Sequence, residues 1–503
     1  MNTFKRKALS CAVLGGLGAV AGSAHAVYQD PNGLGQALIY PYYTVQQQGG
    51  NAFNTYISVV NTTTRGKALK VRFREGKNSR EVLDFNLFLS PNDVWTAAIV
   101  PTGTGTGADV GARIVTGDAS CTSPAIPATG MDFRNYAYVA AVDSAGLGVD
   151  RTREGYIEVV EMATVNNVAP MNLLTAITHT NAGVPANCNV ALPNPLLAPA
   201  GTFTAASGGV SGTYTLINVS NGSDFGGNAV SLANFSSSPT GFYTDVGDES
   251  SNLSSAFPPV AVVVANQPNG TTVYTAAYAS GADAVSATMM HSAVINEYAL
   301  DSVTRSNTDW VLTFPTKRFY VTTLAASAPF TNKFTASGAC ETIGFQYFNR
   351  EEAGATAALG DFSPSLPGVS DALCWESTVL SIRNGTSHMP TTSASGVLGS
   401  LNAQPVNVRT TFQNGWARLT FTGANSIIGL SSAGGTVVNA NTGAAAAGVI
   451  NFQGLPVVGF MARTLNNGLL SCTTSTGTAS TACQGSYGSL FDHKYLDTIT
   501  PAP

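Results

Sequence analysis

In the stretch KALKVRFRE (residues 67–75), the apolar residues Leu69, Val71 and Phe73 alternate with the basic residues Lys70, Arg72 and Arg74. A period of two is typical of a β-strand with one buried face and one polar face. The stretch LDFNLFL (residues 83–89) repeats the pattern, and the intervening EGKNSR (residues 75–80) contains turn-forming residues. The two stretches therefore predict a pair of antiparallel strands joined by a hairpin.

Strand-length runs of apolar or alternating residues recur along the rest of the chain, between clusters of Gly, Ser, Asn and Pro. They fall at residues 95–99, 156–162, 214–219, 310–314, 319–323, 417–421 and 457–462. Many short strands with frequent turns favour antiparallel sandwiches over a parallel α/β sheet. We therefore expect a mainly β protein with antiparallel, immunoglobulin-like β-sandwich lobes and long loops rich in Gly, Ser, Thr and Asn.

One segment departs from the strand pattern. Residues 283–300 contain neither Gly nor Pro, and Val285, Met289 and Ala293 follow helical spacing. Asp283 is a suitable N-cap residue. The sequence therefore predicts one inserted helix over residues 283–300.

The N-terminus has the three parts of a secretory signal peptide. Three basic residues at positions 5–7 precede an apolar run at 8–21, and small residues at 24 and 26 offer a cleavage site. We expect residues 1–26 to be removed and Val27 to begin an extracytoplasmic protein, secreted or at the cell surface, with the periplasm as the alternative. No later apolar run reaches the roughly 20 residues that span a membrane, so we expect no transmembrane segment.

The mature chain is too long for one ordinary hydrophobic core. We expect two lobes, a β-sandwich lobe over residues 27–195 and a second β-rich lobe over residues 205–503 that contains the helix. The alternative is that strands from both halves share one sheet.

Charge is scarce, because only 11% of residues are charged against about a quarter in ordinary soluble domains. The signal peptide contains three basic residues and no acidic residue, so the mature chain has a net charge of −8. This balance argues against nucleic-acid binding. A polar but uncharged surface is typical of secreted adhesins and surface arrays, although secreted enzymes also have it.

Six cysteines remain after removal of the signal peptide, and an even number in an exported chain indicates structural disulfides. Six cysteines allow 15 pairings, of which we favour the sequential one. The predicted pairs are Cys121–Cys188, Cys340–Cys374 and Cys472–Cys483. None has the close spacing of a metal site.

No catalytic or cofactor motif is present in the sequence. The mature chain's histidines, His179, His291, His388 and His493, form no H-E-x-x-H motif, and there is no G-x-S-x-G. Glu158 and Glu161 lie in an apolar strand, but three residues apart they point to opposite faces. We expect one to face solvent and the other to pair with Arg151 or Arg153. No residue is assigned a catalytic, cofactor or metal role.

Two charged clusters are candidate binding features. Asp245, Asp248 and Glu249 lie in a glycine-containing turn of the kind that can bind calcium, although the spacing is not that of an EF-hand. The second cluster is basic, and in a chain so poor in charge it is a candidate docking surface for an acidic polysaccharide, lipopolysaccharide phosphate or a neighbouring subunit. Its residues are Lys70, Arg72, Arg74, Lys77 and Arg80. The alternative is a solvated strand face that protects a sheet edge.

Four sequence blocks carry a resemblance to a known group of proteins. They are QALIYPYY (36–43), EGKNSREVLDFN (75–86), REGYIE (153–158) and TDWVLTFPTKRF (308–319). Together they resemble a group of exported, cell-surface-type proteins of Gram-negative proteobacteria to which no activity is assigned. The resemblance runs from about residue 27 to residues 486–494. It implies export and transfers no ligand or catalytic residue.

These observations favour a non-enzymatic cell-surface protein with a structural or adhesive role, whose partners are copies of itself or cell-surface polysaccharide. The alternative is a secreted polysaccharide-binding module or glycan-active hydrolase, in which exposed aromatic residues such as Tyr40, Tyr42 and Tyr43 line a groove. For these tyrosines we favour ordinary strand packing. An outer-membrane barrel does not fit, because the chain ends in TPAP rather than in a strand.

Overall fold

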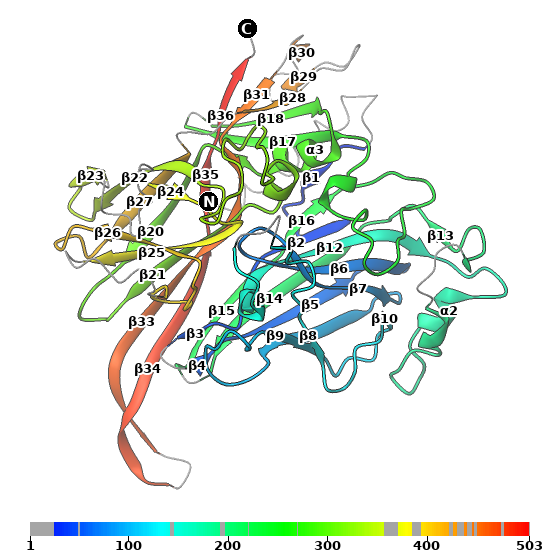
Figure 1. Cartoon of the computed structure of the whole chain (residues 1–503), viewed down its shortest axis with the longest axis horizontal. Helices are drawn as coiled ribbons and strands as arrows, with labels where there is room; N and C mark the ends of the chain where they lie inside the picture. The colour runs from blue at the N-terminus through cyan, green and yellow to red at the C-terminus, as the bar shows by residue number, and fades with distance from the viewer. Residues whose placement is uncertain are drawn as a thin grey trace, which may run out of the picture.

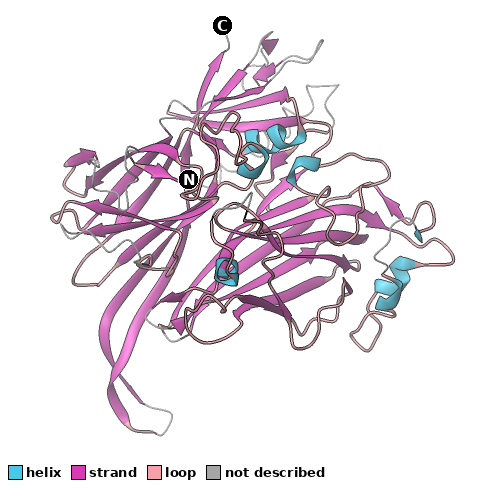
Figure 2. Cartoon of the chain, viewed as in Figure 1, coloured by secondary structure: helices cyan, strands magenta, loops and turns pink. Residues whose placement is uncertain are grey.

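The computed structural model shows a mainly β protein with few short helices (Figures 1 and 2). It describes residues 25–48, 51–140, 145–191, 197–219, 221–268, 270–356, 371–384, 394–421, 426–429, 437–439, 445–446, 450–473 and 477–501. Residues 1–24 of the predicted signal peptide lie outside this part. Val27, the predicted first mature residue, is buried, and its backbone hydrogen-bonds to Val260 and Val262.

Two large antiparallel sheets are built mostly from the first half of the chain. The eight-stranded sheet contains, in order, β1 (Tyr28–Gln29), β16 (Val230–Ala233), β2 (Ala37–Thr44), β12 (Glu154–Val165), β6 (Gly66–Glu75), β7 (Glu81–Leu89) and β10 (Thr122–Ser123), with β13 (Phe203–Thr204) on β12. The six-stranded sheet contains, in order, β11 (Met131–Asp132), β9 (Ala112–Val115), β8 (Val94–Pro101), β5 (Asn54–Asn61), β14 (Val210–Asn218) and β15 (Ser223–Asn228).

Alternation along the strands packs these two sheets against each other. From the eight-stranded sheet, Leu69, Val71 and Phe73 of β6 enter a core that also contains Trp95 and Ile99 of β8 in the six-stranded sheet. The predicted hairpin of β6 and β7 is confirmed, with Val71 paired to Phe85. Antiparallel sheets in face-to-face contact agree with the expected fold class, while the immunoglobulin-like strand order is not confirmed.

The second half of the chain forms the remaining sheets. A second six-stranded sheet contains β23 (Gly354–Thr356), β22 (Glu341–Asn349), β27 (Asn414–Phe421), β20 (Ala293–Ala299) and β35 (Lys494–Leu496), with β24 (Ala372–Leu373) on β22. A five-stranded sheet contains β26 (Ala403–Val408), β25 (Ser377–Asn384), β21 (Asn307–Thr313), β33 (Val458–Thr473) and β34 (Ala479–Asp492). Among the ladders of the described strands, β25–β26 is parallel and the others are antiparallel.

Smaller sheets complete the described strands. One contains β17 (Val260–Gln267), β18 (Gly270–Ala277), β29 (Val437–Asn439) and β30 (Ala445–Ala446), and another contains β28 (Ser426–Gly429), β31 (Ile450–Gln453) and β36 (Thr498–Pro501). Two-stranded pairs are formed by β19 (Met290–His291) with β32 (Leu455–Pro456) and by β3 (Gln47–Gln48) with β4 (Asn51–Ala52). β33 and β34 form a long hairpin that extends from the rest of the molecule (Figure 1).

The five-stranded sheet is shared between two hydrophobic cores. Val311 of β21 and Phe460 of β33 enter the core between the two N-terminal sheets. Trp310 and Leu312 flank Val311 on β21, and their side chains point to the opposite face of the sheet. There they enter a second core, which also contains Phe345 of β22. Moreover, β14, β15 and β16 follow the predicted boundary at residues 195–205 but belong to sheets of the first half. Strands on both sides of the predicted boundary therefore pair in the same sheets.

The predicted helix over residues 283–300 is correct only in its first part. Helix α3 (Gly281–Thr288) is capped by Ser280, whose Oγ accepts a hydrogen bond from the backbone of Asp283. The chain then forms β19 and β20, because the β-branched pair Val294 and Ile295 favours a strand. Because residues 283–300 contain neither Gly nor Pro, their composition gave no sign that the helix ends at Thr288.

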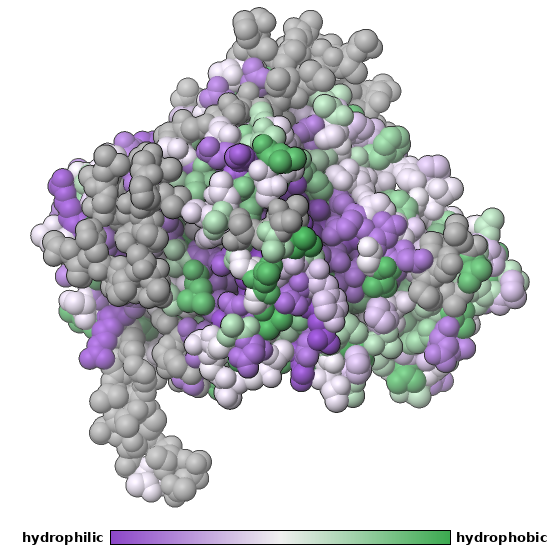
Figure 3. Space-filling view, in the orientation of Figure 1, coloured by the Kyte–Doolittle hydropathy of each residue, from purple (hydrophilic) through white to green (hydrophobic). Residues whose placement is uncertain are grey.

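The predicted strand at 319–323 is also wrong, because the 3₁₀ helix η5 (Lys317–Phe319) and a turn occupy this region. The other described helices are α2 (Leu173–Ile177), η1 (Val149–Arg153), η2 (Cys188–Val190) and η4 (Leu253–Ser255). In the described part of the chain, no helix is long and apolar enough to cross a membrane. The face shown in Figure 3 mixes hydrophilic and hydrophobic side chains, with the hydrophilic ones gathered towards its middle.

Candidate functional site

The basic face of β6 is buried, which corrects the prediction of an exposed docking surface at Lys70, Arg72 and Arg74. The segment 245–251 covers it and supplies its partners. Lys70 Nζ donates to the Asp245 carbonyl at 2.6 Å, and Arg72 donates to the carbonyls of Asp248 and Ser251. Burial of a charged side chain is tolerated only with such hydrogen bonds.

The two other residues of the predicted docking surface lie in the β6–β7 turn and are half-buried. Lys77 Nζ donates to the Ala145 carbonyl at 3.2 Å and lies over the ring of Trp375. Arg80 lines a pocket next to the basic face of β6.

The acidic turn considered as a calcium site is engaged with this basic face. Glu249 forms an ion pair with Arg74, with 2.7 Å between Oε2 and the guanidinium nitrogen, while Asp245 and Asp248 present backbone carbonyls to Lys70 and Arg72. Among the described residues, no group of three or more His, Cys, Asp or Glu side chains is placed to hold a metal ion. The acidic turn therefore acts as a cover for the basic strand.

Glu158 and Glu161 are both buried, so the expectation that one faces solvent is wrong. Glu158 lies between Arg74 and Arg318, 3.3 Å from a nitrogen of each. Glu161 is 2.9 Å from Lys67 Nζ, in an ion pair with no solvent exposure. Neither carboxylate faces solvent, because both faces of this strand are covered. Their partners are Arg74, Arg318 and Lys67 in place of the expected Arg151 or Arg153.

Arg151 and Arg153, the partners that were expected for Glu158 or Glu161, contact other groups. Arg151 pairs with Glu75 at 2.9 Å, and Glu75 also accepts hydrogen bonds from the backbone of the β6–β7 turn. Arg153 donates to the Asp150 carbonyl at 3.2 Å.

Next to the buried basic face lies a polar pocket of about 430 Å³, which we call the charged pocket. The β6–β7 hairpin, the segment 245–251, η5 and the start of β25 contribute to it. Its ionisable lining residues are Arg74, Arg80, Arg318, Glu81, Glu249 and Glu376. Guanidinium and carboxyl groups from segments far apart in sequence thus converge on one pocket.

The three carboxyl groups of the charged pocket titrate differently. Burial, together with the charges of Asp84 and Glu249, raises the pKa of Glu81 to about 7. Burial likewise raises the pKa of Glu376 to about 7, although Lys317 and a hydrogen bond from Ser79 oppose the rise.

Glu249 behaves in the opposite way. Burial disfavours its ionisation, but the charges of Arg74, Arg72 and Arg318 outweigh that effect and lower the pKa of Glu249 to about 2. The pocket therefore contains one permanently ionised carboxylate and two that titrate near neutral pH.

A second, larger hollow of about 610 Å³ lies on the outer face of β5, β8, β9 and β14, and we call it the uncharged hollow. Its lining contains no Asp, Glu, Lys, Arg or His among the described residues. Hydroxyl side chains predominate, and Tyr56 is the largest exposed side chain, with 46% exposure. The lining residues whose hydroxyl-bearing side chains lie on this outer face are Tyr56, Ser58, Thr96, Thr116, Thr213 and Thr215.

The absence of charge extends over the outer face of the three central strands. Residues at alternate positions of β5, β8 and β14 point outward, and ladder pairing places Ser58 beside Thr96 and Thr213. The outward-facing residues are Asn54, Tyr56, Ser58 and Val60 on β5, Val94, Thr96, Ala98 and Val100 on β8, and Ser211, Thr213, Thr215 and Ile217 on β14. An exposed sheet face in a soluble protein is normally polar, and this one is polar only through hydroxyl and amide groups.

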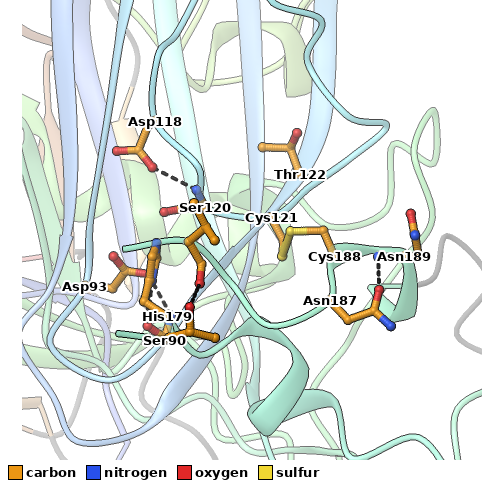
Figure 4. The surroundings of a disulfide bond; sticks show 12 residues. Ser90, Asp93, Asp118, Ser120, Cys121, Thr122, His179, Asn187, Cys188 and Asn189 are labelled. Atoms are coloured by element: carbon orange, nitrogen blue, oxygen red, sulfur yellow. Dashed lines mark hydrogen bonds and ion pairs between the residues drawn. A yellow bond between two sulfur atoms is a disulfide. The ribbon is translucent and has the colours of Figure 1, made fainter. Parts of the chain in front are cut away.

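The first disulfide has a Ser, an Asp and a His side chain near it (Figure 4). Ser90 Oγ and Asp93 Oδ2 both approach Nδ1 of His179, at 3.4 and 3.5 Å. A catalytic triad instead places serine at one ring nitrogen and the carboxylate at the other. Asp93 also accepts hydrogen bonds from the Ser90 backbone and hydroxyl, so this group stabilises a turn.

Two of the predicted disulfides are present in the structure, Cys121–Cys188 and Cys340–Cys374. The first joins Cys121, directly before β10, to Cys188 at the start of η2, with a sequence separation of 67. The side chains of the third predicted pair, Cys472 and Cys483, lie outside the described residues. Disulfides and β-rich structure together agree with a protein of an oxidising compartment.

The described histidines of the second half have structural partners. His291 Nδ1 lies 2.7 Å from Asp497, and its ring stacks on Tyr495. His493 interacts with the Val311 carbonyl at 2.9 Å, and burial lowers the pKa of His493 to about 4. His388 lies outside the described residues.

Tyr40, Tyr42 and Tyr43 are fully buried, so they line no groove, and packing is their role. Their hydroxyls donate to the Ser58 carbonyl, to the Glu154 carboxylate and to the Thr152 carbonyl, respectively. Among the described residues of the six-stranded sheet that contains β5, the exposed aromatic residue is Tyr56, which was not among the predicted site residues.

Neither the charged pocket nor the uncharged hollow was predicted as a whole. The alternation in NTYISVVN (residues 54–61) places Tyr56 on the face opposite Ile57 and Val59, which is a readable sign of an exposed aromatic residue. The convergence of Glu81, Arg318 and Glu376 depends on contacts across some 300 residues, and no local pattern marks it. Comparison with protein-family models, curated proteins and solved structures finds no match to this chain.

Proposed function

We propose that the protein is an exported, non-enzymatic adhesive protein of the cell surface, of the Gram-negative kind that its sequence resembles, and that it binds neutral polysaccharide in the uncharged hollow. One observation carries the proposal. A hollow of about 610 Å³ on an open sheet face presents hydroxyl groups among apolar side chains around an exposed tyrosine, with no charged side chain among the described lining residues. Binding in this way would attach the protein to a glycan-covered surface.

The chemistry of the lining matches an uncharged sugar chain. The ring of Tyr56 offers an apolar face against which a pyranose ring can stack, and its hydroxyl is a polar edge. Ser58 and Thr213, whose hydroxyls lie 2.7 Å apart, can exchange hydrogen bonds with sugar hydroxyls. Among the described lining residues no carboxyl group is available for general acid catalysis of glycoside cleavage, and the nearby Asp118 carboxylate accepts a hydrogen bond from the Thr96 backbone.

Shape favours a sugar chain over a second copy of the same face. Two copies related by a two-fold axis would place the same surface against itself. Because the surface is hollowed, its centre would stay unfilled, and an interface that leaves voids loses packing energy. An extended polymer can instead occupy the hollow.

Replacing Tyr56 with alanine is expected to weaken binding of a neutral polysaccharide by about tenfold, because the stacking surface is lost. Dextran, galactomannan and a soluble β-glucan are suitable probes in affinity electrophoresis, followed by calorimetry with the glycan that retards the protein. Tyr487→Ala is the matched control, because Tyr487 is exposed on β34, in another sheet. This control is expected to bind like the unmodified protein.

Thr213→Arg tests the same site by adding a charge and bulk to the hollow, and it should also weaken binding. Equal glycan affinity in Tyr56→Ala and the unmodified protein would contradict the proposal. Sedimentation that shows a dimer abolished by both Tyr56→Ala and Thr213→Arg would assign the face to self-association instead.

A further inference from the structure

The charged pocket lies where distant parts of the chain meet, away from the uncharged hollow. Arg74 and Glu81 belong to the β6–β7 hairpin, Arg318 to η5, and Glu376 precedes β25. Burying ionisable groups costs desolvation free energy. Only 11% of the residues in this chain are charged, yet several ionisable groups line this one pocket. Buried polar groups with perturbed pKa values in a cavity are candidate binding groups.

Arg318 is held in place but incompletely paired. Its guanidinium lies over the ring of Phe319, 4.1 Å from the ring centroid, and its side chain is 14% exposed. Its carboxylate neighbours are Glu158 at 3.3 Å and Glu249 at 3.8 Å. Nη2 donates to both Glu158 oxygens, whereas Nη1 lies 3.8 Å from Glu249, which is beyond hydrogen-bond distance. A guanidinium has five N–H donors, so Arg318 retains capacity for a further acceptor.

We propose that the charged pocket binds a sugar acid, with the carboxylate of the ligand on Arg318 and its hydroxyls on Glu81 and Glu376. A guanidinium matches a carboxylate in a bidentate arrangement. The two glutamates can accept hydrogen bonds from sugar hydroxyls when ionised and donate one when protonated. The volume of about 430 Å³ suits a single sugar unit rather than a long chain.

Charge balance makes this binding dependent on pH. Glu81 faces Asp84 and Glu249 as well as Arg72 and Arg74, while Glu376 faces Lys317, Glu75, Arg318 and Ser79. As the pH falls through about 7, Glu81 and Glu376 take up protons and the negative charge of the pocket decreases. The carboxylate of a sugar acid stays ionised in this range. Its binding should therefore tighten on acidification.

Calorimetry with sodium D-glucuronate tests the proposal on the full mature chain. We expect binding that is at least about threefold tighter near pH 6 than near pH 8. Arg318→Gln is expected to weaken it by about tenfold or more, because a charge-assisted pair is lost. Arg113→Gln is the matched control, since Arg113 pairs with the partly exposed Asp132 and does not line the pocket, and it should bind like the unmodified protein.

Glu376→Gln and Glu81→Gln provide a second readout. An amide is neutral at both pH values, so each variant should show a smaller pH dependence than the unmodified protein. The Glu81 side chain is 17% exposed, so Glu81→Gln keeps one informative variant if Arg318→Gln fails to fold.

Three ligands serve as comparisons, namely D-glucose, acetate and inorganic phosphate. Glucose lacks the carboxylate and acetate lacks the hydroxyls, so both should bind more weakly than glucuronate. Equal binding of glucose, equal or tighter binding of phosphate, or an unchanged affinity in Arg318→Gln would overturn the proposal. No binding of glucuronate to the folded protein at either pH would do the same.

Discussion

Replacing Glu154 with alanine is expected to lower the free energy of unfolding by about 3–5 kcal/mol, because several buried donors lose their shared acceptor. The Glu154 carboxylate accepts hydrogen bonds from Tyr42 Oη and Ser400 Oγ, both at 2.6 Å, and from Gln46 Nε2 at 3.0 Å. It also accepts from the backbone of Leu401 and Asn402. It thereby joins β12 and β2 to a segment almost 250 residues further along the chain.

Urea unfolding followed by circular dichroism measures this effect. Glu297→Ala is the matched control, because Glu297 is 58% exposed and pairs with the equally exposed Lys494 at 3.6 Å. Such a surface pair contributes about 0–1 kcal/mol, so the control should lie close to the unmodified protein. Similar losses in Glu154→Ala and Glu297→Ala would show that the carboxylate of Glu154 does not stabilise the junction.

Lys67→Met should be comparably destabilising, by about 3–5 kcal/mol, because it leaves the buried carboxylate of Glu161 without its counter-charge. Both side chains of this pair are fully buried, 2.9 Å apart. Glu161 would retain hydrogen bonds from the backbone of Ser207 and Gly208, which satisfy its oxygens but do not neutralise it.

The double variant Lys67→Met/Glu161→Gln separates charge from packing. Because it contains no uncompensated charge, it is expected to recover part of the stability lost in Lys67→Met, which a double-mutant cycle measures as a coupling energy. Lys494→Met is the surface control. Losses that simply add, with no coupling between positions 67 and 161, would contradict the argument.

Local patterns predicted the strands well where one face enters a core. The alternation of KALKVRFRE identified β6, and the apolar face of Leu69, Val71 and Phe73 is the buried one. The same pattern was misleading for the opposite face, because alternation separates two faces without showing what covers each. Arg72 and Arg74 are buried by a segment some 175 residues away, and nothing in the local sequence encodes that contact.

The same limit applies to the helix and to the candidate sites. Residues 283–288 are helical and residues 293–299 form a strand, since pairing with β27 and β35 outweighs the weak helical spacing of Val285, Met289 and Ala293. Tyr56 could be recognised as outward-facing from its strand alone. The charged pocket could not, because Glu81, Arg318 and Glu376 meet only after the chain has folded.

The sheet shared between the two cores also constrains the order of events during synthesis. Phe460 packs against Tyr42 and Tyr214, with ring centroids 6.5 and 5.8 Å apart, so the last fifth of the chain completes a core that begins near residue 38. Because the chain is synthesised from the N-terminus to the C-terminus, the apolar faces of β2 and β14 stay partly exposed until β33 has been synthesised. Contacts so distant in sequence slow folding and expose aggregation-prone surface meanwhile.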